Sequence, residues 1–410
     1  MRAKRANRNR FEGYRKFRSK ACRLMEVLEL YASKAFGSKF NPFAWSGALA
    51  ACAIVVSFIT GALMLFWYVP SPDLAMGSVA HITNDVFLGP LMRSMHRVSA
   101  ELLVIILVIH LFRNWASGRN LGPRWSNWIL GLIALALVGK ISWSGYTLPW
   151  DERAMVLVEW GRNILAAADK WPIVGWLKIG TLLSLPMNTA ATESDLLTRM
   201  FALHIGGAIV LVFLLMWHLR RVSSPMMRPP AALLLGLVGY IVLVALVVPI
   251  AKEALKPFNP FAPPEMVSVD VFTNFPLIFY PLLGAPIFVA VFTLIWLALV
   301  FLPKLEPYKP AIACVREKSC TGCRLCINDC PYEAIRMVVH PDPKLRARGR
   351  EIAKVIPKNC TACGICVGSC SFDAIELPGL TSDEIVSRMK WVLETGEPSG
   401  IVREIEGEPG

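Results

Sequence analysis

The chain has 410 residues, of which 55% are hydrophobic and 18% charged, with a formal net charge of +13 and a mean hydropathy of +0.49. Soluble globular proteins have about a quarter charged residues, so this composition excludes an ordinary soluble enzyme and predicts an integral membrane protein. Several apolar segments reach about 20 residues, which is enough to cross a bilayer. We predict six membrane spans, at about residues 46–69, 93–115, 127–148, 199–219, 230–250 and 282–302.

The amino-terminal segment, residues 1–39, is strongly basic. Between Met1 and Leu24 it carries ten lysines and arginines and a single acid, Glu12. Such a run can bind nucleic acid, but beside a multispan protein it more often contacts anionic lipid or fixes topology, so we expect no nucleic-acid partner. No short apolar core and cleavage site follow it, so it is not interpreted as a signal peptide.

Charge in the loops predicts the orientation. The loops after the second and fourth spans are basic, whereas the loop 70–90 has no lysine or arginine. Since lysines and arginines near helix ends stay in the cytoplasm, the amino terminus is predicted to be cytoplasmic. Six spans return the chain to that side, in the inner (cytoplasmic) membrane.

Two pairs of histidines share one spacing. His96 and His110 lie fourteen residues apart on the second span, and so do His204 and His218 on the fourth. Fourteen residues of helix rise about 21 Å and return to the same face. Two such helices facing each other would provide two bis-histidine haem sites, His96 with His204 near the outer face and His110 with His218 near the cytoplasmic face. The alternative is a set of structural core histidines, but polar groups in lipid are costly and usually functional.

Four glycines repeat the same interval on the first and third spans. They are Gly47, Gly61, Gly131 and Gly145. Glycine in a membrane helix can simply permit close helix packing. Because these four share the histidine register, we expect them to make room for the edges of the haem macrocycles.

These features resemble a known family. Residues 40–228 resemble the haem-bearing half of cytochrome b from the bc and bf complexes, through the histidine and glycine registers, Arg93-Ser94-Met95-His96-Arg97 and Gly145-Tyr146-Thr147-Leu148-Pro149-Trp150-Asp151. Residues 229–303 resemble the start of the companion subunit of the bf branch through Asn259-Pro260-Phe261-Ala262, with two spans rather than three. Trp45 stands where the bf branch has a haem-attaching cysteine, so no additional haem is expected.

The resemblance implies a helical membrane bundle with two b haems and a quinone or quinol substrate. It also implies other subunits of a redox complex, a Rieske or c-type cytochrome partner on the outer face, and a homodimer. The family's outer quinol site uses a Pro-Glu-Trp-Tyr sequence, and this chain has Val269-Asp270-Val271-Phe272 there. Asp270 is therefore a candidate acceptor of a quinol proton. The alternative is an ordinary loop aspartate at the membrane surface.

Two charged residues fall inside the predicted spans. Glu101 and Lys140 each lie about 10–12 Å below the outer membrane face by helical rise. An unpaired charge at that depth is costly, so a partner or a water-filled cavity is expected. We predict an ion pair between Glu101 and Lys140 beside the outer haem or quinol pocket.

Residues 304–379 are predicted to form a small soluble α+β domain with two cysteine motifs. The motifs are Cys320, Cys323, Cys326 and Cys330, followed by Pro331, and Cys360, Cys363, Cys366 and Cys370, followed by Ser371. This is the spacing of a bacterial-type two-cluster ferredoxin, in which the fourth cysteine of each motif binds the other cluster. We therefore expect one [4Fe-4S] cluster on Cys320, Cys323, Cys326 and Cys370, and a second on Cys360, Cys363, Cys366 and Cys330.

The eight cysteines have two alternative interpretations, a zinc site and disulfides. Zinc ribbons use paired Cys-x-x-Cys motifs, but a repeated run of four is unusual for zinc. Disulfides do not fit the reducing cytoplasm. Between the motifs, the basic stretch 344–350 could dock an acidic redox partner or the membrane surface, or could be a solvated loop. Residues 380–410 form a tail with a short helix at about 381–395.

Together the modules predict a membrane-bound electron-transfer subunit, an oxidoreductase. Electrons would pass between a quinone site, two haems and two cytoplasmic clusters, with a soluble cytoplasmic donor or acceptor. One alternative is a bc-type quinol oxidoreductase subunit that bifurcates electrons to a Rieske or c-type partner. Another is a non-catalytic redox anchor that connects a soluble dehydrogenase to the quinone pool.

Overall fold

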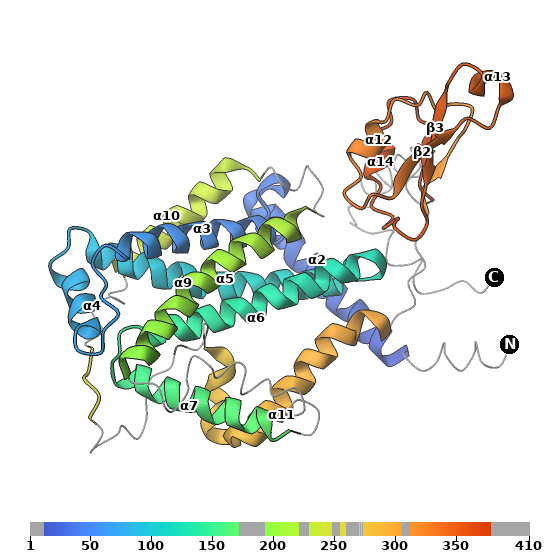
Figure 1. Ribbon diagram of the computed structural model, residues 1–410. Helices are drawn as coiled ribbons and strands as arrows, with labels where there is room; N and C mark the ends of the chain where they lie inside the picture. Colours follow the sequence, from blue (N-terminus) through green and yellow to red (C-terminus); the bar gives the residue numbers. More distant parts are fainter. Residues whose placement is uncertain are drawn as a thin grey trace. The chain divides into compact units, whose positions relative to one another are not determined.

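The computed structural model describes residues 12–171, 193–220, 229–247, 255–259, 270, 272, 274–305 and 312–378. The chain divides into two compact units (Figure 1). The first comprises Met1–Asn120, Trp125–Leu219 and Met226–Glu306, and the second comprises Leu121–Arg124, Arg220–Pro225 and Pro307–Gly410. The predicted tail helix at about 381–395 lies outside the described residues.

The first unit is entirely helical in its described part. Its α-helices are α2 (Glu12–Phe36), α3 (Ser46–Met64), α4 (Ala75–Asn84), α5 (Gly89–Ala116), α6 (Trp125–Thr147), α7 (Glu152–Asp169), α9 (Glu193–Leu219), α10 (Ala231–Val247) and α11 (Tyr280–Phe301). Short 3-10 turns are η1 (Ser38–Phe40), η7 (Phe275–Phe279) and η8 (Leu302–Leu305). A further turn, η2 (Gly122–Arg124), belongs to the second unit.

Five described segments are long and apolar enough to cross a membrane. They are Ser46–Met64, Gly89–Ala116, Gly122–Thr147, Ser194–Leu219 and Phe275–Leu305. They match five of the six predicted spans. The sixth corresponds to α10, an apolar helix of 17 residues that rises about 26 Å, slightly less than a bilayer core. The protein is an integral membrane protein.

The four helices that carry the histidines and glycines pack as two pairs, α3 with α5 and α6 with α9 (Figure 1). Small residues permit the close approach of α3 to its neighbours, since Ala50 and Ala53 are buried against Leu103 of α5 and Val138 of α6. Helix α10 packs on the first pair through Ile241, which is fully buried. The apolar layer at Ala53 and Leu103 therefore separates the two ends of the bundle.

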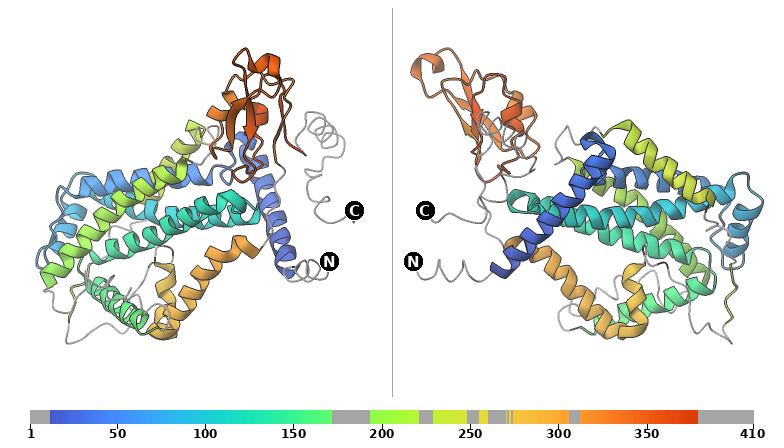
Figure 2. Two further views of the ribbon diagram at one scale, coloured as in Figure 1. Left: turned by 45° about the vertical axis from the view of Figure 1, so that its right-hand side comes forward. Right: turned by 180° about the vertical axis from the view of Figure 1, so that it is seen from behind.

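Helices α2, α7 and α11 surround this bundle. Arg113 at the end of α5 pairs with Glu29 of α2 at 2.6 Å between Nε and Oε1. Asp151 begins α7, because its side chain accepts a hydrogen bond from the Ala154 N–H. Helix α11, which contacts α7, is bent at Gly284, where φ is +68° (Figure 2). Neither α2 nor α7 was predicted from the sequence.

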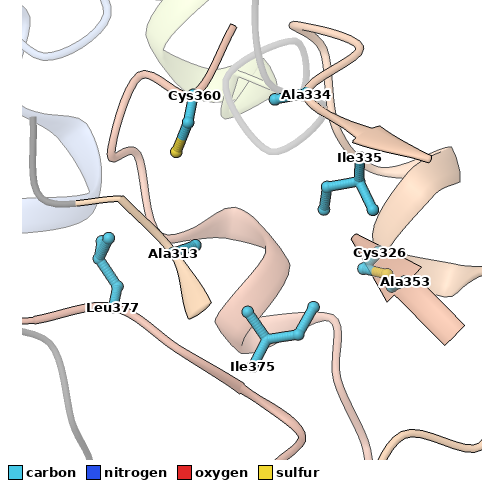
Figure 3. Packing of buried hydrophobic residues seen from close by; sticks show 8 residues of the cluster. All are labelled: Ala313, Cys326, Ala334, Ile335, Ala353, Cys360, Ile375 and Leu377. Atoms are coloured by element: carbon cyan, nitrogen blue, oxygen red, sulfur yellow. The ribbon is translucent and has the colours of Figure 1, made fainter. Parts of the chain in front are cut away.

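The second unit contains two small antiparallel sheets. One pairs β1 (Cys314–Val315) with β4 (Ile375–Glu376), and the other pairs β2 (Ile335–Val339) with β3 (Glu351–Val355). Its α-helices are single turns, α12 (Leu325–Asn328), α13 (Pro343–Arg346) and α14 (Ile365–Gly368). Cys326 and Cys360 lie within its apolar core, beside Ile335 and Ile375 (Figure 3). This is a small α+β fold, as predicted.

The second unit is an internal repeat with an offset of 40 residues, so that Cys320 matches Cys360 and Cys330 matches Cys370. The N–H of Ala334 donates to the sulphur of Cys330 at 3.3 Å, and the N–H of Ala374 donates to the sulphur of Cys370 at 3.2 Å. The repeat therefore extends from the sequence to the hydrogen bonds of the cysteine loops.

Candidate redox-cofactor sites

The structure brings the four histidines together as two pairs. The ring centres of His96 and His204 are 6.2 Å apart, across the gap between α5 and α9. Two imidazoles that bind one iron from opposite sides have ring centres roughly 6 Å apart, since metal–nitrogen bonds are about 2 Å long. This pair, the outer pair, therefore has the separation that a bis-histidine haem requires.

Hydrogen bonds at Nδ1 orient both rings of the outer pair. Nδ1 of His96 lies 2.9 Å from the carbonyl oxygen of Ser57 and 3.1 Å from the hydroxyl of Thr60. Nδ1 of His204 lies 2.9 Å from the carbonyl oxygen of Ile141 and 3.4 Å from the hydroxyl of Ser144. A carbonyl oxygen can only accept, so Nδ1 carries the proton and leaves the lone pair of Nε2 for a metal.

His110 and His218 form the inner pair, at the other end of the same helices. His110 contacts the position of Gly47 on α3, and His218 contacts that of Gly131 on α6. The hydroxyl of Ser46 lies 3.1 Å from Nδ1 of His110, and the Asn114 amide donates to its Nε2 at 3.1 Å. Nδ1 of His218 is buried without a hydrogen-bond partner among the described residues, although the Asn127 carbonyl interacts with this ring. The inner pair is thus held by fewer bonds than the outer pair.

Each of the four glycines contacts one of these histidine rings. A Cβ atom placed on Gly145 would lie 2.7 Å from Cε1 of His204, and one on Gly61 would lie 3.0 Å from Cε1 of His96. The corresponding distances are 3.1 Å from Gly47 to His110 and 3.4 Å from Gly131 to His218. The missing side chain of each glycine leaves room for an imidazole ring. That the same glycines make room for the edges of haem macrocycles stays a prediction.

Sequence reasoning missed the hydroxyl residues that hold the rings. Three of the four glycines follow a serine or threonine, in Ser46-Gly47, Thr60-Gly61 and Ser144-Gly145. Each of these hydroxyls contacts the histidine that its glycine admits. The fourth glycine follows Leu130, and its histidine, His218, is the one without a hydroxyl partner. The dipeptides were visible in the sequence as a signal.

A cavity of about 310 Å³ lies beside the rings of the outer pair. His96 and His204 line it, together with Gly61, Gly145, Tyr68 and Phe201. Three arginines, Arg93, Arg97 and Arg153, also border it. A largely apolar space that contains two metal-ligating side chains and several cations fits an anionic, apolar macrocycle such as haem.

Asp270 and Glu101 meet beside this cavity. Arg97 donates from Nε to Oε1 of Glu101 at 2.9 Å and lies 3.7 Å from Oδ2 of Asp270. The guanidinium of Arg97 thus contacts two carboxyl groups, those of Glu101 and Asp270. Two carboxylates beside one cation carry one negative charge more than it offsets, so the cluster has room for a proton.

The predicted ion pair between Glu101 and Lys140 is not present. Glu101 pairs with Arg97, one turn away on α5, and Lys140 has no ion-pair partner in the described part of the chain. Helical rise gave the two residues a common depth but did not determine which faces of α5 and α6 meet. Helix α5 packs mainly on α3, and α6 packs mainly on α9, so a common depth does not bring side chains of α5 and α6 together.

The eight cysteines line two cavities in the second unit. One cavity is lined by Cys320, Cys323, Cys326 and Cys370, here called the first group, and the other by Cys330, Cys360, Cys363 and Cys366, here called the second group. Each group takes three cysteines from one motif and one from the other. The predicted assignment of the eight cysteines to two clusters requires this arrangement.

The donor sets fit iron–sulphur clusters better than single ions. Each group has four cysteines, three from one motif and one from the other, which is the donor set of a [4Fe-4S] cluster in a two-cluster ferredoxin. Burial, with a smaller effect of neighbouring cysteines, raises the pKa of Cys326 to about 11 and that of Cys366 to about 12. Burial and crowding thus disfavour the free thiolates, and a bound cationic iron centre would stabilise them.

These sites define a class, a membrane electron-transfer protein with histidine sites in the bilayer and a small cysteine-rich domain. Residues 31–226 match the family described as cytochrome b/b6/petB, and residues 319–374 match the 4Fe-4S dicluster domain. Cytochrome b6 of Heliomicrobium gestii is 31% identical over 193 residues, which cover 45% of this chain and 87% of that protein. Cytochrome b6 of Prochlorothrix hollandica is 31% identical over 202 residues, 48% of this chain and 87% of that protein.

The chain belongs to the cytochrome b/b6 family and carries a 4Fe-4S dicluster domain in addition. A solved structure described as a hyperthermophilic respiratory Complex III has a similar fold, with a TM-score of 0.53 and 20% identity over 65% of this chain and 76% of that one. Family membership implies haem b, and the added domain implies iron–sulphur clusters. The protein is thus an electron-transfer oxidoreductase of the membrane.

Proposed function

We propose that the chain is a quinone-linked electron-transfer subunit with two b haems and two [4Fe-4S] clusters. His96 with His204, and His110 with His218, would hold the haems, and the first and second cysteine groups would hold the clusters. When bound, these groups supply one-electron redox chemistry. The observation that carries the proposal is the cavity at the outer pair, whose lining residue Arg97 contacts the carboxyl groups of Glu101 and Asp270.

Oxidation of a quinol releases two electrons and two protons, so its site needs a proton acceptor beside an electron acceptor. Asp270 is 8% exposed at its side chain and Glu101 is 18% exposed, which keeps both largely out of bulk water. Arg97 offsets one of their negative charges and leaves room for one proton on the pair. We assign Asp270 the role of proton acceptor, and Glu101 the role of sharing that proton.

The remaining assignments concern topology and partners. If α10 crosses the membrane with the five longer spans, the cysteine-rich domain lies on the same side as the basic amino-terminal segment, in the cytoplasm. There it would exchange electrons with the inner pair and with a soluble carrier. Further subunits, a Rieske or c-type partner on the outer face, and a homodimer belong to this proposal through the family relationship.

The test is reduction of the haems by a quinol. The full-length protein in detergent is mixed with decylubiquinol or menadiol, and haem absorbance is followed by stopped flow. We expect the quinol to reduce the haems of the wild-type protein. The Asp270→Asn variant should slow this reduction at least about tenfold, because it lacks the carboxylate that accepts the quinol proton. Asp85→Asn is the matched control, because Asp85 is an exposed acid on the predicted outer side.

Three outcomes contradict parts of the proposal. If Asp85→Asn slows reduction as much as Asp270→Asn, Asp270 is an ordinary loop aspartate. If Asp270→Asn changes nothing, the proton acceptor lies elsewhere. If no quinol reduces the wild-type haems without other subunits, the chain is a redox anchor for another enzyme rather than a quinol-reactive subunit.

A further inference from the structure

The two cysteine groups lie one after the other along the length of the β2–β3 hairpin. Ile335 and Val355 pair at its base and line the cavity of the second group. Met337 and Ala353, the next facing pair on that side, line the cavity of the first group. Two residues of strand advance about 7 Å, so the first group lies nearer the hairpin tip, residues 340–350.

The loop that carries the first group packs directly on the end of this hairpin. A Cβ atom on Gly322 would lie 2.6 Å from the carbonyl oxygen of Glu351, so only glycine permits the contact. Arg324 in the same loop donates from Nη2 to Oε2 of Glu351 at 2.6 Å. The first group and the hairpin tip thus form one continuous end of the domain.

The hairpin tip is basic and ordered. It carries Lys344, Arg346, Arg348 and Arg350, with Asp342 as its single acid. Asp342 accepts a hydrogen bond from the Lys344 N–H at 2.8 Å, and Arg346 donates to the carbonyls of His340 and Pro341. Lys344, Arg348 and Arg350 are exposed and form no ion pair with the described residues. Their charge is therefore available to a partner.

Apolar side chains are exposed at the same end. In the described part of the second unit, the exposed large hydrophobic residues are Leu325, Val339 and Phe372, which are 43%, 62% and 50% exposed. Phe372 lines the cavity of the first group, Leu325 precedes Cys326, and Val339 pairs with Glu351 beside the tip. At the matching positions of the second group, Ile365 and Tyr332 are half-buried. The repeat is thus asymmetric, and its exposed apolar edge belongs to the first group.

We propose that this end of the domain is the docking surface for an acidic, soluble one-electron carrier, and that electrons enter or leave the chain at the first group. The inference rests on the proposed function, which places clusters in the cysteine groups. Basic residues steer an acidic partner, and the small apolar patch excludes water at contact. One electron is exchanged, so one centre is oxidised as the other is reduced, and no bond is formed or broken.

The test uses the full-length protein in detergent with an acidic plant-type [2Fe-2S] ferredoxin as the probe. Arg348→Glu/Arg350→Glu is compared with Lys354→Glu/Lys358→Glu, an identical charge change on exposed residues toward the second group. The tip variant should weaken the Kd and lower the second-order electron-exchange rate constant about tenfold at low salt, with a shallower salt dependence. The control variant should stay within about twofold, because its charges lie away from the docking surface.

Unchanged values of Kd and rate constant in the tip variant overturn the proposal, and so does an equal loss in the control. Cluster potentials and electron paramagnetic resonance spectra should match the wild type. A shift in potential that accounts for the rate loss would instead mean that the tip only tunes the cluster. Arg348→Gln/Arg350→Gln should give an intermediate loss if the doubly acidic variant does not fold. Haem reduction by quinol is measured in parallel, so that failure of the docking proposal is separated from failure of the proposed function.

Discussion

The two histidine pairs use the same helices and the same spacing, yet their surroundings differ. The outer pair, His96 and His204, is held by two backbone carbonyls and two hydroxyls at Nδ1. The inner pair has one hydroxyl contact, at His110, and His218 has none. The glycine contacts are tightest at His204 and loosest at His218. A repeated spacing therefore produces two pairs whose histidines have different hydrogen-bond partners, and we expect the two pairs to differ in rigidity and ligand basicity.

The largest effect is expected from replacing one histidine of each pair. His204→Leu should lose the outer haem alone and His218→Leu the inner haem alone, so each variant retains about half of the wild-type haem. The measurement is haem content per protein, together with a redox titration that identifies the remaining centre. Loss of both haems from either variant would show that the two sites do not form independently.

The glycine contacts provide the next test. Gly145→Ala should strongly reduce occupancy of the outer site, because the new Cβ would lie 2.7 Å from Cε1 of His204. Gly131→Ala should leave the inner site nearly full, because its distance of 3.4 Å is an ordinary contact. Haem content and the shape of the reduced absorption band check both. Equal losses in the two variants would contradict the difference in tightness between the pairs.

A smaller effect, on the midpoint potentials of the haems, is expected from changing the basicity of the histidine ligands. Thr60→Val removes an acceptor from Nδ1 of His96 and should raise the midpoint potential of the outer haem by about 40 mV, the equivalent of a hydrogen bond of about 1 kcal/mol. Leu130→Ser places a hydroxyl before Gly131, as at the other three sites, and should lower the potential of the inner haem by a similar amount. Redox titration measures both shifts. Shifts of the same sign would argue against control by Nδ1.

The smallest effect is expected from removing a hydrogen bond that joins two helices but does not hold a histidine ring. The hydroxyl of Ser99 lies 2.6 Å from that of Ser57 between α5 and α3, but the Ser57 carbonyl holds His96 independently of it. Ser99→Ala should cost about 1 kcal/mol of stability, a drop in Tm of about 2–4 °C, without changing either potential. Thermal loss of haem absorbance and a redox titration test this. A change in the outer potential would connect the two serines to the ligand after all.

The interval of fourteen predicted that the histidines form two pairs and that the glycines share their register, because position along a helix sets both depth and face. The same reasoning failed for Glu101 and Lys140, since depth does not reveal which helices are neighbours. Asp270 approaches Glu101 from a distant part of the chain. Its position depends on how η7 and α11 return to α5, which no local pattern encodes.

The hydroxyl contacts show a different limit. Ser46, Thr60 and Ser144 were present in the sequence beside the glycines, but serine and threonine are common in membrane helices for many reasons. Their meaning becomes specific only when the histidine ring is seen against the same turn of helix. The cysteine groups were easier to predict, because the ligand spacing of a two-cluster domain lies within short loops.

Each ring is supported from within its own helix pair, which has a consequence for assembly. Helix α3 supports both histidines of α5, and α6 supports both histidines of α9. Each pair of helices can therefore orient its two ligands before it meets the other pair. Each bound haem would then join the two helix pairs, since its two ligands come from different pairs. We therefore expect the helix pairs to form before the cofactors are inserted.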